Sequence, residues 1–546
     1  MKTVSSDSIV IGSYSLETLT TGMYENPRHC LREYIQNSYD SIRAARASGL
    51  IEGTAGLVTV SISGTASKPT LTISDDGAGI AADLAVASLV SIGASRKRSA
   101  TNAGFRGIGR LAGIAYCTTL RFTTSAPGEA TETLVEFDCG QMRSYMKPGA
   151  EIQDVREVIR ICTQSETRPA PAEKHFMQVE MIGLIGVGLE FIEIEELIPY
   201  LRQVCPVDYS DRFSFAPRIR AFCEGFGSPL GAIDVETRFK RERKQILKGY
   251  DNAAPTGNGP SNVYDLQLIS SAELGWYAWI GKSSFKGEIV DDTVAGVRFR
   301  LKNIQVGGSE IVEDLASELT AGRTEGRLQR WAVGEVFITN PSVVPNARRD
   351  GFEDNAAWRD IKKDVRLKVA KRVVALVRAA SKSRSALKNI LLEIANLDRQ
   401  VLIGSQDAEA IGRLIALADR IIIKLNADKL SGIDPNEIGE QVAKVKGLRD
   451  TLVEAKGKIK KQEDEPAGAE EQPAEETHDD TPEPEGDADP AASIGDTDQH
   501  EEDEEREEPW SSEEMLASLI EVITSELGQT EAERLLVLAR ENLLAP

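Results

Sequence analysis

The chain has 546 residues, a net charge of −22, six cysteines and four histidines. A chain of this length is too long to fold around a single hydrophobic core, so we expect roughly three or four domains. No apolar run approaches the ~18 residues of a membrane-spanning helix, and the N-terminus lacks the basic and apolar parts of a secretory signal. The cysteines are scattered with no C-x-x-C pair, which predicts a cytoplasmic protein with reduced core cysteines rather than disulfides or a zinc site.

Residues 1–212 alternate between helix-like and strand-like segments, beginning with an apolar helix. Strand-like patterns of period two follow at 57–63, 70–74, 118–125, 133–139 and 176–184. Strands interleaved with helices predict an α/β sandwich.

The opening helix contains LREYIQNSYDSI, residues 31–42, in which Glu33, Asn37 and Asp40 are spaced four and three apart. At ~3.6 residues per turn, this spacing places three polar groups on one stripe of an otherwise apolar helix. On its own, such a stripe is most often the solvated face of a surface helix.

Two glycine-containing segments follow this helix. DDGAGI, residues 75–80, comes directly after a predicted strand; Gly77 and Gly79 permit a tight turn, and Asp75 can accept a hydrogen bond. GFRGIGRLAGIAYC, residues 104–117, is a glycine-rich loop that leads into an apolar helix, where backbone N–H groups suit phosphates. Each segment alone also fits an ordinary turn. A dinucleotide-binding fold is disfavoured, because its glycine loop follows the first strand.

The order of polar helix stripe, D-x-G-x-G turn and glycine loop resembles the GHKL ATPases. This superfamily includes DNA gyrase B, the ninety-kilodalton heat-shock chaperones, sensor histidine kinases and MutL. The resemblance covers residues 20–185, is nearest to the chaperone and MutL branches, and implies a Bergerat α/β sandwich that binds ATP and Mg²⁺. The histidine-kinase branch is disfavoured, because His29 precedes the nucleotide helix and His175 precedes a strand.

The resemblance implies a role for each matching residue. Glu33 would be the general base that activates the attacking water, Asn37 the Mg²⁺ ligand, and Asp40 part of the nucleotide-side network. Asp75 would accept a hydrogen bond from the adenine amino group. The glycines implied to let the base and the phosphates approach are Gly77, Gly79, Gly104, Gly107 and Gly109. The residues implied to flank the phosphates or line a lid are Ser95, Lys97, Arg106 and Ile108.

The chain departs from these relatives at two places. The stretch from Lys97 to Gly104 is short for a swinging helical lid. Met177 stands where the relatives carry a threonine beside the adenine-binding acid.

Residues 213–356 hold further strand patterns, among them 295–306 and 334–340, and are expected to form an α/β middle domain similar to a transducer domain. Within it, VVPNARRDGFE at 343–353 resembles the chaperones' middle-domain loop that faces the nucleotide. The resemblance implies that Asn346 and Arg349 complete the site, with Arg349 reaching the γ-phosphate when the two domains close. Taken alone, the segment also fits a basic surface turn.

The remaining chain divides into three segments. Residues 357–462 have long amphipathic helical patterns suited to coiled-coil packing. Residues 463–508 contain 22 acidic residues and one arginine, which accounts for −21 of the net charge of −22, and we expect a disordered acidic linker there. Residues 509–546 have two capping boxes and predict a helical hairpin that docks on a partner chain, on a second copy or on the body.

The sequence therefore predicts a Mg²⁺-dependent ATPase whose ATP-driven closure and dimerisation remodel a protein client. The alternative is a nucleic-acid-linked clamp similar to MutL and the MORC ATPases, in genome or phage defence. Nucleic acid would bind through the basic stretches 238–248 and 359–388, although each is more often a solvated face. A third class, a nucleotide-gated scaffold that hardly turns over, is disfavoured by Glu33.

Overall fold

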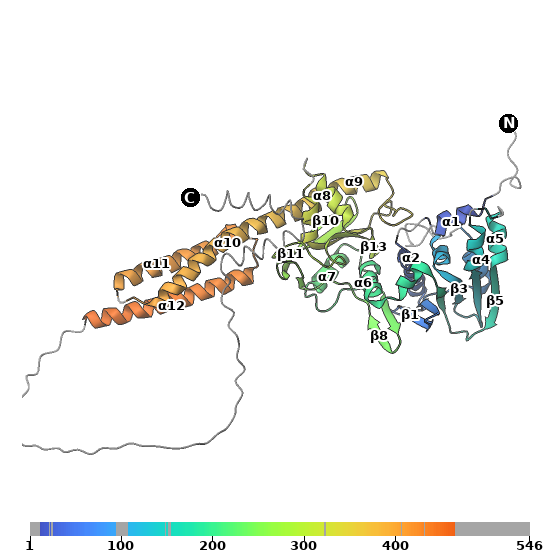
Figure 1. Cartoon of the computed structure of the whole chain (residues 1–546), viewed down its shortest axis with the longest axis horizontal. Coiled ribbons are helices and arrows are strands. Elements are labelled where there is room, and N and C mark those ends of the chain that lie inside the picture. The colour runs from blue at the N-terminus through green and yellow to red at the C-terminus, as the bar shows by residue number, and fades with distance from the viewer. Residues whose placement is uncertain are drawn as a thin grey trace, which may run out of the picture. The chain divides into compact units, whose positions relative to one another are not determined.

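The computed structural model of the chain describes residues 11–20, 22, 26–93, 107–147, 149–150, 154–320, 324–405, 407–430 and 432–464 (Figure 1). These residues form two β-sheets with helices packed against them, which confirms the predicted α/β class. The expected acidic linker at 463–508 lies outside the described residues beyond Asp464, and so does the expected hairpin at 509–546.

An eight-stranded sheet forms the N-terminal part, in the order β5-β4-β3-β6-β2-β1-β7-β8. Neighbouring strands are antiparallel, except for the parallel pair of β1 and β7. The strands are β1 (Leu57–Thr65), β2 (Lys68–Asp75), β3 (Cys117–Ser125), β4 (Thr131–Asp138), β5 (Thr163–Pro169), β6 (Phe176–Leu184), β7 (Asp234–Phe239) and β8 (Glu242–Gln245). All five strands expected in this part form, with small shifts of their ends. The edge strand β5 was not expected, because its exposed sequence TQSETRP has no apolar alternation.

The helices of this part share one hydrophobic core with a single face of the sheet. In β2, Leu71 and Ile73 point into this core against α2, whereas Ser74 faces the other, uncovered side. The helices are α1 (Tyr14–Thr20), α2 (His29–Ala47), α3 (Ala82–Val90), α4 (Cys139–Tyr145), α5 (Val155–Cys162) and α6 (Ile194–Val204), with 3₁₀ helices η2 (Gly109–Ala115) and η3 (Gly186–Ile192). Residues of opposite polarity therefore alternate along the strands, as expected for a sheet with one buried face.

The first sheet extends past residue 212, the expected end of the N-terminal domain. Strand β7 pairs with β1, and the β7–β8 hairpin forms one edge of this sheet. The chain thus leaves the first sheet after β6, forms α6 and α7 (Ala216–Gly225), and returns to complete it.

A six-stranded sheet forms the middle part, in the order β13-β12-β14-β11-β10-β9. Its strands are β9 (Ala253–Ala254), β10 (Ser261–Ser271), β11 (Trp276–Ser283), β12 (Gly296–Leu301), β13 (Ile304–Val306) and β14 (Val333–Ile338). Helix α7 covers one face, while α8 (Glu310–Ser317) and α9 (Ala356–Val365) cover the other. The single strand expected at 295–306 is instead a hairpin, because Lys302 and Asn303 form a turn with φ of 53° and 61°.

The core of this sheet contains a buried ionic cluster around Glu335 of β14. Its carboxylate accepts hydrogen bonds from Lys248 Nζ at 2.9 Å, from Arg300 Nε at 2.6 Å, and from the Tyr209 hydroxyl. Burial raises the pKa of Glu335, but the charges of Arg300 and Lys248 outweigh this and lower it to about 2. Burial and the neighbouring Arg300 lower the pKa of Lys248 to about 7. Two cations therefore depend on one carboxylate in a fully buried position.

A helical region follows, as expected from residue 357 onward. Helix α9 continues through a π-helical segment, η5 (Arg366–Ala370), into the 33-residue helix α10 (Lys371–Ile403). Gly404, with φ of 73°, ends α10, and α11 (Ala408–Leu425) and α12 (Pro435–Asp464) pack beside it around a separate apolar core (Figure 1). No helix among the described residues is long and apolar enough to span a membrane. All six cysteines are buried and free of disulfides, as predicted.

Candidate nucleotide site

The polar stripe lies on α2, which is buried in the core on most of its surface. Glu33 and Asp40 are 7% and 4% exposed, and Asn37 is half-buried. The helix ends at Ala47 because Gly49 takes φ of 74° and donates its N–H to the Arg46 carbonyl. The stripe is thus not a solvated surface, and its charges lie within the protein.

The D-x-G-x-G turn is held to three different elements. The N–H of Ala78 donates to the Ser41 carbonyl of α2, and the N–H of Ile80 donates to Thr124 Oγ1 of β3. Asp76, the second acid of the motif, accepts a hydrogen bond from the N–H of Leu57 at the start of β1. Asp76 therefore fastens the turn to the sheet, which leaves the first acid for another role.

The glycines of the turn have no room for a side chain. A Cβ on Gly77 would lie 2.2 Å from Ser41 Oγ, and one on Gly79 would lie 1.9 Å from the Ser125 carbonyl oxygen. Gly79 also has φ of 63°, in the left-handed region that favours glycine. Only glycine at these two positions lets the turn lie between α2 and β3.

Asp75 is 3% exposed and points to the helix-covered side of the sheet, as do Leu71 and Ile73. Its Oδ1 accepts a hydrogen bond from the Gly77 N–H at 3.0 Å, and its Oδ2 is buried with no hydrogen-bond partner among the described residues. Burial raises the pKa of Asp75 to about 6, against smaller opposing effects of Ser38, Ser41 and the Gly77 N–H. A buried acceptor oxygen without a partner suits a ligand with an amino group, such as adenine.

The glycine loop comes into contact with α2. Gly107 has φ of 70°, and a Cβ on Gly109 would lie 2.3 Å from Glu33 Oε2. Tyr34 ties the same segment to α2, since its hydroxyl donates to the Arg110 carbonyl and accepts from the Gly113 N–H. The prediction of an apolar α-helix after the loop is wrong, because residues 109–115 form only the short 3₁₀ helix η2. Ile108 directly precedes this helix. Any phosphate binding here therefore relies on close backbone approach rather than on a helix dipole.

The middle domain reaches α2 through the loop that carries Asn346 and Arg349. Arg349 Nε lies 2.6 Å from Glu33 Oε1, and both side chains are less than 10% exposed. In return, Arg32 of α2 donates to the carbonyl oxygens of Arg348 and Arg349. Asn346 lies at the other end of the loop turn, where its carbonyl accepts the Arg349 N–H. Residues over 300 positions apart thus meet at the expected catalytic glutamate.

A second middle-domain cation lies near the stripe. This cation is Lys302, in the turn between β12 and β13. Burial lowers the pKa of Lys302 to about 8, and the Asp40 carboxylate opposes this effect. Arg43 and Arg349 lower the pKa by smaller amounts. Nothing in the sequence pointed to this residue, because a lysine side chain is normally solvated.

Four of the expected site residues, Ser95, Lys97, Gly104 and Arg106, lie outside the described residues. The described ones come from α2, the turn after β2, the loop before η2 and the middle-domain loop. Met177 pairs directly with Asp75 in the register of β2 and β6, so it lies beside the acid that the resemblance assigns to adenine. The hydroxyl groups near Asp75 come instead from Ser38 and Ser41 of α2. Their spacing of three places them on one side of the helix, but the sequence alone did not indicate that this side faces Asp75.

The donor set fits Mg²⁺ held together with a nucleotide. Within the described part of the chain, no group of three or more His, Cys, Asp or Glu side chains is arranged to hold a metal ion. Mg²⁺ in nucleotide sites needs only one or two protein oxygens, since phosphates and waters complete its octahedron. The Asn37 side chain, one helical turn after Glu33, offers an amide oxygen of this kind.

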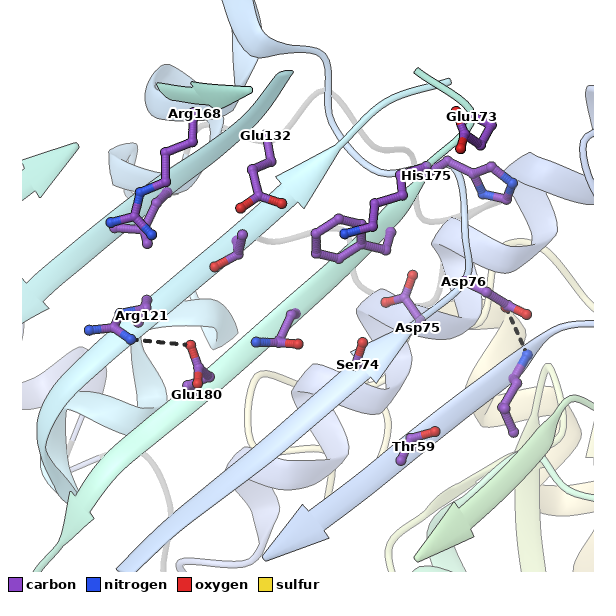
Figure 2. A pocket seen from close by; sticks show the side chains of 16 residues that line it. Thr59, Ser74, Asp75, Asp76, Arg121, Glu132, Arg168, Glu173, His175 and Glu180 are labelled. Atoms are coloured by element: carbon purple, nitrogen blue, oxygen red, sulfur yellow. Dashed lines mark hydrogen bonds and ion pairs between the residues drawn. The ribbon is translucent and has the colours of Figure 1, made fainter. Parts of the chain in front are cut away.

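A hollow of about 720 Å³ opens on the uncovered side of the first sheet (Figure 2). It is lined by charged side chains of both signs, including Arg121, Glu132 and Glu180, and it touches the turn only at Asp75 and Asp76. Among the described residues, neither Glu33 nor the part of the glycine loop from Gly107 onward lines it. This hollow is therefore distinct from the site that α2, the turn and Arg349 form on the covered side.

Residues 24–176 match the family model of histidine kinase-, DNA gyrase B- and HSP90-like ATPases. The match spans α2, the D-x-G-x-G turn and the glycine loop, and it supports the resemblance to the GHKL superfamily over this part of the chain. It supports ATP binding and hydrolysis in general, and it does not separate the chaperone branch from the MutL branch. No curated protein matches the chain.

Proposed function

We propose that the chain is a Mg²⁺-dependent ATPase in which the middle domain completes the site built by α2, the turn and the glycine loop. The observation that carries the proposal is the buried contact between Arg349 and Glu33. It brings a middle-domain cation to the carboxylate that the superfamily resemblance makes the general base. Such a contact gives the site a means to couple its chemistry to the movement of a second domain.

Each described residue has a task in this proposal. Asp75 accepts the adenine amino group through Oδ2, which has no hydrogen-bond partner among the described residues, and Gly77 and Gly79 allow the base to lie close. Asn37 holds Mg²⁺, which when bound neutralises charge on the phosphates. Glu33 orients and deprotonates the attacking water, which needs little covalent chemistry from the protein.

Arg349 acts as the sensor of the nucleotide. Its guanidinium pairs with Glu33 in this structure, and we propose that it exchanges this partner for the γ-phosphate when ATP is bound. A buried guanidinium needs an anion in either state, so the exchange keeps its charge compensated. Release of Glu33 then frees the base for water, and ATP binding is thereby linked to the position of the middle domain.

The test uses the full chain and two neighbouring arginines. Arg349→Ala should retain ATP binding but lose at least about 100-fold in turnover, as expected for a cation at the γ-phosphate. The control, Arg348→Ala, removes the exposed neighbour in the same loop and should stay within about twofold of the parent. Removal of Mg²⁺ with a chelator should abolish hydrolysis. Equal turnover in the two variants would contradict the sensor role.

We further propose that the ATP cycle closes a dimer and remodels a protein client. The Glu33→Ala variant, which should bind ATP without hydrolysing it, would hold the client in the closed state. Stimulation of the ATPase by an unfolded or partner protein would support this function. DNA-stimulated hydrolysis would instead support the alternative clamp function.

One observation favours that alternative, a nucleic-acid-linked clamp. In the β7–β8 hairpin, Arg238 and Arg243 share Glu236, but Lys240, Arg241 and Lys244 are exposed and have no ion-pair partner among the described residues. A two-stranded ribbon with cations at its tip fits the phosphate backbone beside a groove. Lys248, counted with this basic stretch, is instead buried in the ionic cluster.

The second basic stretch, 359–388, is less suited to phosphates. Several of its cations have acidic partners: Arg366 with Glu318, Lys368 with Asp364 and Arg378 with Glu325. The pairs leave less free charge on this helix surface than the sequence suggests.

A charge-matched comparison tests the hairpin. The triple variant Lys240→Ser, Arg241→Ser, Lys244→Ser should weaken duplex DNA binding and reduce the slope of log K against log salt by about 2 to 3. The control triple Lys363→Ser, Lys371→Ser, Lys382→Ser removes the same charge from α9 and α10 and should leave binding nearly unchanged. Equal effects of the two triples would rule out a specific role of the hairpin.

A further inference from the structure

His175 contacts the D-x-G-x-G turn from the uncovered side of the sheet, where it also lines the hollow. Its Nδ1 is 2.8 Å from the Gly77 carbonyl oxygen. A carbonyl oxygen only accepts hydrogen bonds, so Nδ1 carries the proton and donates it. Figure 2 shows His175 beside the chain that runs on from Asp75 and Asp76.

The backbone around His175 is fixed on both sides. The preceding carbonyl, of Lys174, accepts a hydrogen bond from Ser125 Oγ, and the following carbonyl, of Phe176, accepts one from Thr124 Oγ1. The same Thr124 hydroxyl also accepts the N–H of Ile80, at the end of the turn. The imidazole is thus aimed at Gly77 by a segment that β3 holds in place.

The Gly77 peptide connects this imidazole to Asp75. Its N–H donates to Asp75 Oδ1 at 3.0 Å, and its carbonyl accepts from His175. With both backbone groups of Gly77 engaged, the carboxylate has one oxygen committed to the turn and the other, Oδ2, unpartnered among the described residues. The Gly77 peptide thus holds Asp75 Oδ1 on one side and His175 on the other, while the Ser38 and Ser41 hydroxyl groups act on the same carboxylate from α2.

We infer that His175 is a positioning residue for adenine recognition, acting through the Gly77 peptide to orient the Asp75 carboxylate. The inference rests on the proposed function, because it assigns Asp75 to the adenine amino group. It predicts selectivity as well as affinity: guanine presents a carbonyl oxygen where adenine presents its amino group, and a fixed carboxylate rejects that acceptor. If the Asp75 carboxylate were free to turn, the site would discriminate less between adenine and guanine.

Two variants of His175 separate the donor from the bulk of the ring. His175→Phe keeps an aromatic ring but has no donor, whereas His175→Asn places an amide N–H close to the position of Nδ1. We expect His175→Phe to raise the KM for ATP about fivefold, the scale of one hydrogen bond, and to narrow the ATP-over-GTP preference. Its kcat at saturating ATP should remain near the parent value, since Glu33 and Arg349 are untouched. His175→Asn should restore both the KM and the preference.

The outcomes distinguish this inference from the function on which it rests. If the parent chain binds no ATP, the proposed function fails and this inference fails with it. If the parent binds ATP but His175→Phe keeps the parent KM and the parent preference, the inference alone is overturned. A His175→Asn variant that folds like the parent, by its thermal unfolding profile, but discriminates as poorly as His175→Phe would also overturn it. Parallel losses for ATP and GTP in His175→Phe would indicate a general structural role and would count against it equally.

Discussion

The Arg349 guanidinium of the middle domain lies 2.6 Å from the Glu33 carboxylate of α2, and both groups are buried. Removing one partner of such a pair leaves an uncompensated buried charge, whereas exchanging it for another anion does not. The contact therefore defines an arrangement in which Glu33, the proposed base, is paired and the middle-domain loop is attached to α2. A nucleotide phosphate is an anion of the kind that can replace Glu33 at Arg349.

Gly109→Ala tests the close approach of the glycine loop to the base. The added methyl would lie 2.3 Å from Glu33 Oε2 and 2.8 Å from Glu33 Cγ, so the glutamate side chain must move. We expect turnover to fall by at least about 100-fold, the contribution of a positioned general base. ATP hydrolysis by the purified chain measures this. Gly225→Ala is the control and should behave as the parent, because no atom of the described residues lies within 4 Å of the new methyl at the end of α7.

The raised pKa of Asp75 predicts the pH dependence of ATP binding. Burial, with a smaller contribution from the neighbouring Asp76, raises this pKa from 3.8 to about 6. The charged carboxylate is the better acceptor for an amino group, so ATP affinity should rise as the pH increases through about 6 and then level off. Asp75→Asn should bind ATP about 10-fold more weakly and lose this dependence. His175→Asn, in which the neighbouring imidazole is absent, should retain it.

The same shift has a consequence of opposite sign for stability. Folded Asp75 holds its proton up to a pH of about 6, while the unfolded chain releases it near 3.8. Asp75 therefore contributes most to the free energy of unfolding below a pH of about 3.8. This contribution declines as the pH rises to about 6. Stability favours the protonated form, whereas ATP binding favours the charged form, as is common for functional groups.

The ionic cluster in the middle sheet predicts unequal effects for its members. Glu335→Gln leaves Lys248 and Arg300 buried without a carboxylate and should lower the free energy of unfolding by about 3–5 kcal/mol. Lys248→Met keeps the volume and leaves the Arg300–Glu335 pair, so it should change stability by less than about 1.5 kcal/mol. Denaturant unfolding of the two variants tests the difference. A larger loss in Lys248→Met than in Glu335→Gln would be incompatible with a single carboxylate serving two cations.

Much of the fold was predictable from the sequence because its strands alternate clearly. Period-two patterns gave the five strands β1, β2, β3, β4 and β6, whose inner residues pack under helices on one face. The edge strand β5 escaped prediction because exposed edges need no apolar alternation. The return of β7 to β1 escaped it as well, because parallel pairing with a strand nearly 180 residues earlier leaves no local pattern.

The site was predictable where a local motif carries it. The spacing of Glu33, Asn37 and Asp40 on one helix could be recognised in the sequence, and so could the two glycine segments. The contact between Arg349 and Glu33 needs a second domain, so only the superfamily resemblance pointed to Arg349. Nothing in the sequence pointed to His175, which acts through one carbonyl oxygen of a residue 98 positions away.

Glu33 is the proposed base of the ATPase site, and the Glu33→Ala variant is the decisive test of this role. Equilibrium ATP binding and steady-state hydrolysis should be measured on the same preparation of the full chain, with Mg²⁺, beside the parent. We predict ATP binding at least as tight as in the parent, because Arg349 loses its competing anion, and turnover reduced by at least about 100-fold. Hydrolysis by Glu33→Ala at the parent rate would show that Glu33 is not the base.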